Sequence, residues 1–206
     1  ARDNFTTHGH AFQIDWVWGD CVMIVYFDVG SVIIQGVKNP SAYLCSVSNI
    51  DQSTAKNIKP LVHRFQRNEI NEADFWNECE RNGIPKPTNW RTFWADNLKD
   101  AVTDKQVLTI AERLRTAGHQ TGIISNIIQP HADILHERGI FKNFNPVILS
   151  CAVGTRKPEP KIFHVAAEKA KTPFNKIIFI DDVTENVEAA RALGIDAIHY
   201  TSSDKL

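Results

Sequence analysis

Three apolar stretches of the sequence end in polar side chains that can take part in chemistry. Residues 23–27 end at Asp28, residues 121–124 end at Ser125 and Asn126, and residues 177–180 end at Asp181 and Asp182. A carboxylate can act as a nucleophile toward phosphorus, and neighbouring carboxylates offer the oxygen ligands that Mg²⁺ prefers. A lysine such as Lys157 and a hydroxyl such as that of Ser125 can hold phosphoryl oxygens as negative charge spreads over them. If the fold brings these side chains together, they predict a site for phosphoryl transfer.

The same stretches predict the sheet that must position these side chains. Short apolar runs rich in β-branched residues, without polar alternation, are typical of strands buried on both faces. From residue 104 onward, helical patterns near 107–117, 130–138, 159–171 and 185–193 alternate with strand patterns near 121–124, 146–149, 177–180 and 197–200. Such alternation indicates a parallel sheet with right-handed crossovers, whose strands end at one edge. We therefore expect an α/β fold, a Rossmann-like doubly wound parallel sheet, with Lys157 in a loop near that edge.

A helical segment interrupts this pattern after the first strand. Apolar residues at 58, 61, 62 and 65 follow the spacing of one helix face, although Pro60 lies among them and predicts a boundary or a kink. Aromatic residues recur at helical spacing, and we expect them to pack inside this segment rather than to contact a ligand: Phe75, Trp76, Trp90, Phe93 and Trp94. We therefore divide the chain into an α/β core of residues 23–36 and 104–206 and a small inserted helical cap of residues 37–103.

The composition is that of a folded globular protein. The chain has 206 residues, of which 43% are hydrophobic and 23% charged. A net charge of −1 argues against broad nucleic-acid binding and against a polybasic membrane anchor, and the apolar runs are too short to span a bilayer. The four cysteines are scattered without a CxxC pair, so we expect a reduced, cytoplasmic protein without a disulfide framework or a zinc site. We expect a small phosphorylated metabolite as the partner, and either a monomer or a homodimer.

The first residues stand apart from this organisation. Met23 is the only methionine, and it begins the first strand pattern. Residues 1–22 show no clear period and lack the features of a signal peptide. We expect them to be an N-terminal extension that the native protein lacks, with translation starting at Met23. A native N-terminus upstream of Met23, found by intact-mass measurement, would contradict this expectation.

Four sequence blocks, in this order, resemble the haloacid dehalogenase-like hydrolase superfamily. They are FDVG (27–30), IISN (123–126), RKPEPKIF (156–163) and IFIDDVTENVEAARALGI (178–195). The resemblance covers nearly all of residues 23–200 and is greatest to the branch with a helical cap between the first two blocks. It implies an α/β hydrolase that uses an aspartate nucleophile and Mg²⁺.

The resemblance also implies a role for each candidate residue on the phosphoryl side of the site. Asp28 would be the nucleophile and a ligand of Mg²⁺. Ser125 would donate a hydrogen bond to the phosphoryl group, with Asn126 beside it as a second phosphate-binding residue. Lys157 would neutralise the nucleophile and the phosphate.

On the metal side, the resemblance implies that Asp182 is a direct ligand of Mg²⁺. Asp181 would bind the metal directly or through water. The backbone carbonyl of Gly30 would also face the metal, and a backbone ligand does not depend on the type of side chain.

Gly30 is the one departure from the pattern of most phosphatases in this superfamily. They carry a second aspartate there, which protonates the leaving group and later activates water. A positioned acid or base is worth roughly 10²–10⁴ in rate, so we expect slow turnover of alkyl phosphates, a substrate with a better leaving group, or a cap residue or water as a substitute. His63, His131 and His136 are candidates, but lone histidines are more often surface or core residues, so we assign the role to none of them. The DxG pattern also resembles a sub-branch that includes sugar-phosphate phosphatases and the phosphatase domain of some epoxide hydrolases.

Two alternatives stay open beside the Mg²⁺-dependent phosphatase. A 2-haloacid dehalogenase uses the same nucleophile on carbon and also lacks the second aspartate, but it needs no metal and normally has no acidic pair in the fourth block. A non-catalytic binding protein would explain Gly30. Such a protein has no need to keep a cluster of like charges, whose mutual repulsion destabilises the fold. Asp181 and Asp182 therefore favour the phosphatase.

Overall fold

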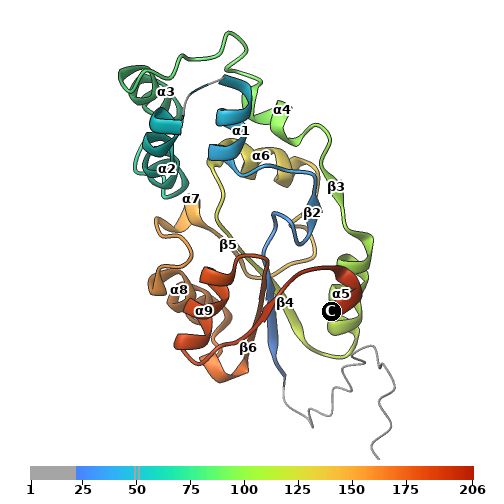
Figure 1. Cartoon of the computed structure of the whole chain (residues 1–206). Coiled ribbons are helices and arrows are strands. Elements are labelled where there is room, and N and C mark those ends of the chain that lie inside the picture. The colour runs from blue at the N-terminus through green and yellow to red at the C-terminus, as the bar shows by residue number, and fades with distance from the viewer. Residues whose placement is uncertain (1–21, 49, 51) are drawn as a thin grey trace, which may run out of the picture.

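A five-stranded parallel sheet forms the centre of the protein in the computed structural model, which describes residues 22–48, 50 and 52–206 (Figure 1). Its strands are β1 (Ile24–Phe27), β4 (Gln120–Ser125), β5 (Val147–Leu149), β6 (Ile177–Asp181) and β7 (Asp196–His199), in the order β5-β4-β1-β6-β7. The expected α/β fold with a Rossmann-like parallel sheet is therefore confirmed. The expectation about the N-terminal extension falls almost entirely outside the described residues.

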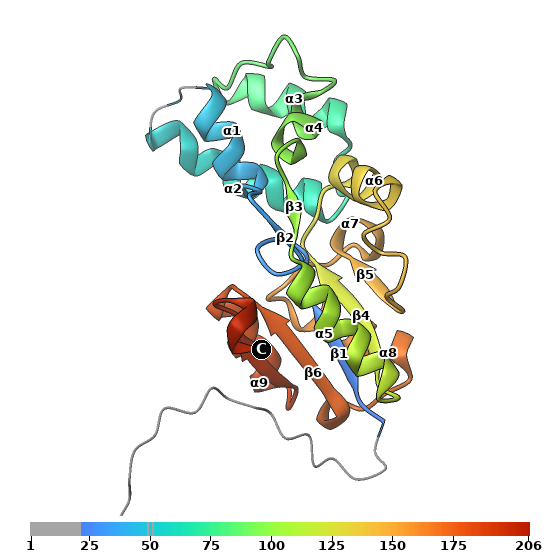
Figure 2. The ribbon, with the colours of Figure 1, turned by 90° about the vertical axis from the view of Figure 1, so that its right-hand side faces the viewer.

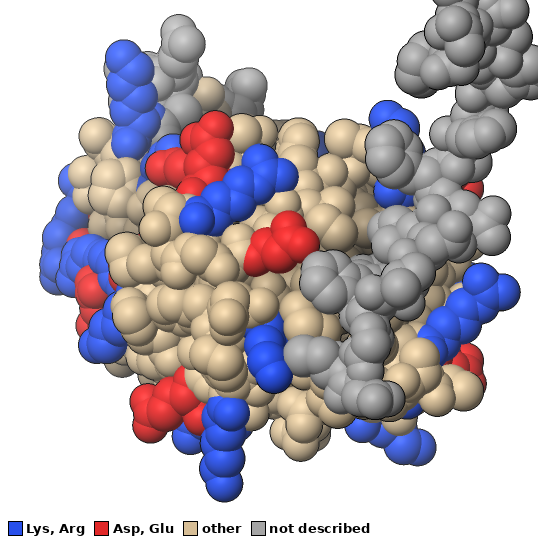
Figure 3. Space-filling model, turned by 90° about the horizontal axis from the view of Figure 1, so that it is seen from below, with Lys and Arg blue, Asp and Glu red and all other residues tan. Residues whose placement is uncertain are grey.

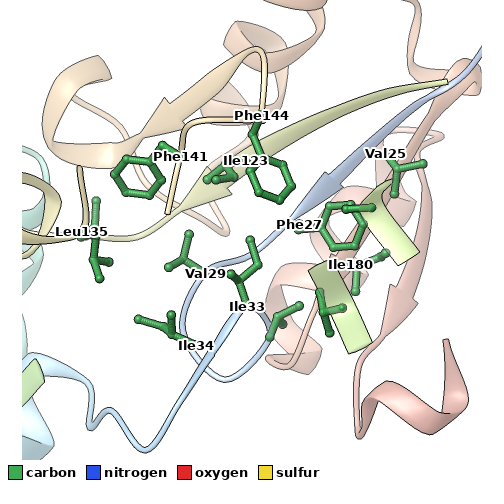
Figure 4. Packing of buried hydrophobic residues seen from close by; sticks show 14 of the residues in the cluster. Val25, Phe27, Val29, Ile33, Ile34, Ile123, Leu135, Phe141, Phe144 and Ile180 are labelled. Carbon is green, nitrogen blue, oxygen red and sulfur yellow. The ribbon is translucent and has the colours of Figure 1, made fainter. Parts of the chain in front are cut away.

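Helices cover both faces of the sheet and bury its apolar side chains. On one face, helices α5 (Lys105–Thr116) and α6 (Gln129–Glu137) share a core with β1, β4 and β6, in which Phe27 packs edge-to-face on Phe144 (Figure 4). On the other face, α8 (Pro160–Ala170) and α9 (Thr184–Ala192) pack on the alternate residues of the same strands. Because β1 is buried on both faces, its sequence reads as a continuous apolar run.

The segment between β1 and α5 forms a helical insertion beyond the ends of the strands (Figures 1 and 2). The chain leaves the core through β2 (Ile34–Gln35) and returns through β3 (Val102–Thr103), and these two short strands pair antiparallel. Between them lie α1 (Pro40–Ser48), α2 (Gln52–Gln66), α3 (Glu72–Arg81) and α4 (Phe93–Leu98). Helix α2 continues through Pro60, which therefore does not mark a helix boundary.

The helical insertion has a hydrophobic core of its own, rich in aromatic rings. Phe75, Trp76, Phe93 and Trp94 are buried in it, and Trp76 stacks on Trp94 with ring centroids 5.7 Å apart. Trp90 is only partly buried at its margin, with Lys86 Nζ 3.8 Å from the ring centroid. The expectation that these aromatic residues pack inside the insertion is confirmed for the four buried rings.

Sequence patterns did not indicate three short helical segments: α7 (Ser150–Val153), η1 (Phe174–Lys176) and η2 (Ser203–Lys205). Segments this short cannot show a helical period, because one turn takes 3.6 residues.

The described residues show neither a membrane-spanning helix nor, on the face opposite the insertion, a continuous basic surface. None of the described helices combines the length with the apolar character that a membrane crossing requires. On the opposite face, the described Lys and Arg side chains are interspersed with Asp and Glu (Figure 3).

Candidate active site

The central strand and its two neighbours bring the predicted carboxylates together. Asp28 directly follows β1, and its backbone N–H donates to the carbonyl of Ile180 at 2.9 Å, which continues the pairing of β1 with β6. Asp181 is the last residue of β6, and Ser125 is the last residue of β4 on the other side of β1. Parallel strands of matched register therefore place these residues at one edge of the sheet.

Lys157 lies at the centre of this edge and is fully buried, with 1% of its side chain exposed. Its Nζ lies 2.8 Å from Asp28 Oδ1 and 2.6 Å from Asp181 Oδ2, and it donates to the carbonyl of Ile124 at 2.8 Å. Burial acts to lower the pKa of Lys157, but the attraction of Asp181 and Asp28 outweighs it and raises the pKa. The lysine therefore stays charged and ties the two carboxylates together.

Asn126 holds the loop that carries Lys157. Its Nδ2 donates to the backbone carbonyl of Lys157 at 2.8 Å, and its Oδ1 accepts from the backbone N–H of Lys157 at 2.7 Å. These two bonds use the side-chain amide of Asn126 to fix the backbone at residue 157. The structure therefore gives Asn126 a positioning role, and a direct contact of this side chain with phosphate stays a prediction.

The three carboxylates Asp28, Asp181 and Asp182 converge within 4.8 Å of one another. Burial raises the pKa of Asp28 to about 6; the charge of Lys157 opposes this shift and that of Asp181 adds to it. Burial, and then the charge of Asp181, also raises the pKa of Asp182. Asp28 Oδ1 is buried and has no aligned hydrogen-bond donor among the described residues, apart from the ion pair with Lys157. Such a set of oxygens fits a divalent cation, which would relieve the repulsion.

The two members of the acidic pair have different surroundings. Asp181 is fully buried, and its Oδ1 accepts from the backbone N–H of Val183 at 2.8 Å and from Asn186 Nδ2 at 2.9 Å. Because Lys157 takes the other oxygen, Asp181 has few lone pairs left for a metal. Asp182 is half-buried and lines the cavity in front of Asp28, so it is the freer ligand.

A cavity of about 880 Å³ lies between this edge of the sheet and the helical insertion. Asp28, Gly30, Ser125, Lys157 and Asp182 line its core side. A Cβ atom added at Gly30 would meet nothing within 4 Å, so there is open space at this position. The cavity is large enough for a small metabolite.

The three histidines that sequence analysis considered as substitute acids differ in position. His63 and His131 line the cavity, whereas His136 is exposed and does not. Burial lowers the pKa of both His63 and His131 to about 4. Both rings are therefore neutral near pH 7 and would be weak proton donors to a leaving group.

The sequence did not reveal two residues whose hydrogen bonds hold parts of the site in place. Asn186 in the first turn of α9 holds Asp181, as described above, and its only signal was a polar side chain at the start of a helix. Ser150 Oγ accepts from the backbone N–H of Ile127 at 2.9 Å and donates to its carbonyl at 3.1 Å. Ser150 thereby fixes the turn after Ser125, and nothing in its local sequence distinguished it.

The burial of His131 predicts a pH-dependent stability. His131 is 5% exposed, and its pKa is lowered from 6.5 to about 4. Between these two pH values, the unfolded chain therefore binds a proton at His131 that the folded chain does not bind. The free energy of unfolding should therefore fall as the pH drops from 6.5 toward 4, by about 3 kcal/mol from this residue. Denaturant titrations should show a shallower pH dependence for His131→Leu. A full wild-type slope in that variant would contradict the expectation.

A family model for "haloacid dehalogenase-like hydrolase" matches residues 22–194. The sesquiterpene phosphatase astK of Aspergillus oryzae is 27% identical over 179 residues, which cover 86% of this chain and 89% of that protein. The bifunctional epoxide hydrolase 2 of Sus scrofa is 27% identical over 143 residues, but these cover 65% of this chain and only 25% of that protein. This chain thus spans a small part of the epoxide hydrolase and most of the phosphatase.

A solved structure shares the fold. The HAD family enzyme of Bacteroides thetaiotaomicron superimposes with a TM-score of 0.71 at 21% identity, over 86% of this chain and 92% of that one. The same enzyme has been crystallised in complex with magnesium and inorganic phosphate, in a structure that gives a TM-score of 0.67 at 20% identity over 86% of this chain and 93% of that one. At this identity the likeness establishes the common architecture.

Proposed function

This chain belongs to the haloacid dehalogenase-like hydrolase family, and on that premise we propose that it is a Mg²⁺-dependent phosphohydrolase of a small phosphorylated metabolite. The observation that carries the proposal is the convergence of Asp28, Asp181 and Asp182 around the buried Lys157, at the base of a cavity. The phosphatase named among the relatives, and the complex of a structural neighbour with magnesium and phosphate, support it.

In the proposed reaction, the carboxylate of Asp28 attacks phosphorus in line with the leaving oxygen. The bond to the leaving group breaks, and an aspartyl-phosphate forms. Water then attacks the same phosphorus, which releases inorganic phosphate and restores the carboxylate. Lys157 holds Asp28 in place and can stabilise the phosphoryl oxygens, while Ser125 at the cavity wall donates a hydrogen bond to them.

Asp28, Asp182 and the carbonyl of Gly30 would hold the Mg²⁺, with Asp181 direct or through water. The carboxylate of Asp28, whose buried Oδ1 pairs with Lys157, and the half-buried Asp182 fit this role. The cation would let an anionic nucleophile approach an anionic phosphate and would polarise a phosphoryl oxygen.

Removal of Mg²⁺ should change stability as well as activity. A ligand present at about 100 times its Kd adds about 2.7 kcal/mol to the free energy of unfolding. We expect a rise of this size on addition of Mg²⁺, measured by thermal unfolding, and its loss in Asp182→Asn. Asp196→Asn is the matched control, because Asp196 is exposed on β7 outside the cluster. An equal Mg²⁺ effect in both variants would argue against the site.

The open space at Gly30 predicts a gain of activity. The new carboxylate of a Gly30→Asp variant would have room to point into the cavity, since an added Cβ meets nothing within 4 Å. It would supply the missing acid and should raise kcat on alkyl phosphates by about 10²-fold. Gly30→Asn, whose new side chain has the same shape and no acid, is the control. Equal rates for the two variants would refute the interpretation that Gly30 limits the reaction.

We further propose that the helical insertion, residues 37–103, acts as a cap that covers the bound substrate and excludes water. Residues from α1 and α2 line the cavity opposite Asp28, which supports this role. We also propose a cytoplasmic location. Of the described cysteines, Cys45, Cys79 and Cys151 are free thiols, as a reducing compartment would keep them.

Phosphate release from a panel of sugar, acyl, nucleotide and aryl phosphates, with and without Mg²⁺, tests the proposal. We expect turnover only with Mg²⁺, and fastest turnover with good leaving groups, because Gly30 provides no acid. Halide release from 2-haloacids without Mg²⁺ would instead establish a dehalogenase. Turnover of neither class would favour a binding role.

A further inference from the structure

One wall of the cavity carries basic side chains that the proposed reaction does not use. Lys59, His63 and Gln66 lie on α2 at the spacing i, i+4, i+7, which places them on one face of the helix, and all three line the cavity. Arg156 lines the cavity from the core side, and its Nε donates to Gln66 Oε1 at 3.0 Å. The insertion and the core thus contribute together to one basic wall.

Neither cation of this wall forms an ion pair among the described residues, although the charges of Glu159 and Glu185 act on Arg156. Arg156 and Lys59 form no ion pair there, whereas Lys157 is paired with both Asp28 and Asp181. The nearest acid in sequence, Glu159, is already bound by Arg67 at 3.0 Å and by Thr155 Oγ1 at 2.8 Å. Glu185 also lines the cavity, but it is exposed in the first turn of α9.

The surroundings of His63 show that these groups lie close to one another. Its pKa is lowered by burial and then by the charges of Arg156, Lys59 and Arg67, while the charge of Glu159 opposes the shift. A neutral imidazole near these cations provides a donor for an anion without adding charge. Arg156 and Lys59 can donate charge-assisted hydrogen bonds to an anion, and His63 a neutral one, from side chains outside the carboxylate cluster.

We propose that Arg156, Lys59 and His63 form a second anion-binding subsite, so that the substrate is a phosphate ester with a further carboxylate or phosphate group. The inference rests on the proposed function, because it takes the Asp28 cluster as the site of the phosphate that is removed. Arg156 and Lys59 would bind the second anion, and the phosphate of the ester would lie at Lys157 and Ser125.

Equilibrium binding of phosphonates tests the inference without turnover. Isothermal titration calorimetry with Mg²⁺ would compare three series of two to six methylene groups: alkylphosphonates, ω-carboxyalkylphosphonates and α,ω-alkanediphosphonates. We expect the second acid to tighten binding by about tenfold or more at the matching length. The last two series distinguish a carboxylate from a phosphate as the preferred group.

Three variants distinguish a loss of anion binding from a loss of contacts between the helical insertion and the core. Arg156→Gln and Lys59→Gln should each reduce the ratio of affinities for the diacid and the monoacid toward one. Arg67→Gln is the matched control. It removes one positive charge that acts on His63 and breaks the bridge from Arg67 to Glu159, but Arg67 does not line the cavity, so the ratio should fall less than in Arg156→Gln or Lys59→Gln.

The outcomes distinguish this inference from the function on which it rests. A wild-type ratio near one, or an equal loss in Arg67→Gln, would overturn the second subsite while leaving the phosphate site intact. Failure of all three series to bind would overturn the phosphate site and the inference together. Because Lys59 is exposed on its helix, Lys59→Gln keeps the test valid even if Arg156→Gln folds poorly.

Discussion

Asp28→Asn should lower phosphate release by at least about 10³-fold, because a carboxamide cannot form the aspartyl-phosphate. The substitution preserves the shape of the side chain and removes one charge from a cluster in which Asp28 and Asp181 repel each other. The variant should therefore fold at least as well as the wild type. Single-turnover kinetics, with far-UV circular dichroism for the fold, would measure both effects.

Val183→Ala provides a control for this variant, since Val183 is exposed next to the acidic pair and has no titratable group. It should retain most of the activity. An Asp28→Asn protein with near-normal turnover would eliminate Asp28 as the nucleophile. Loss of both activity and fold would indicate that the carboxylate is needed for structure.

Lys157→Met should damage both stability and activity. Lys157 is 1% exposed and lies between two carboxylates, so its loss leaves uncompensated buried charge. Breaking a buried ion pair from one side costs about 3–5 kcal/mol in the free energy of unfolding. Loss of the cation that faces the phosphoryl oxygens should also reduce kcat by about 10³-fold. Urea denaturation and steady-state kinetics would measure the two effects.

A second substitution separates the structural from the chemical role of Lys157. Asp181→Asn in the Lys157→Met background removes one of the two orphaned charges, so it should restore part of the lost stability. It should not restore turnover, because the cation is still missing. Recovery of activity along with stability would show that Lys157 acts only on the fold.

The local sequence was sufficient to predict the five strands of the parallel sheet and the residues at their ends, but not the short strands β2 and β3. The apolar run before Asp28 can be recognised as a strand without knowledge of its neighbours in the fold, because a strand buried on both faces needs apolar side chains at every position. Parallel order then follows from the alternation of strands and helices, and it puts Asp28, Ser125 and Asp181 at one edge. The fold class and the candidate carboxylates were therefore predictable.

The tertiary structure decided how these residues interact. The resemblance places Asn126 at the phosphate, which stays a prediction, and only the packing shows that its amide holds the backbone of Lys157. The sequence could not distinguish His131 from His136, because burial depends on which side of α6 meets the insertion. Such differences come from contacts between elements far apart in the chain, which no local pattern records.

The basic wall of the cavity depends most strongly on such long-range contacts. Gln66 and Arg156 are separated by 90 positions in the sequence and meet only because the insertion lies over the ends of the strands. The sequence by itself determined the elements and the reactive groups, since strand burial and helix spacing are local properties. The tertiary structure decided burial, charge pairing and the shape of the cavity, because these depend on the long-range packing of the insertion against the core.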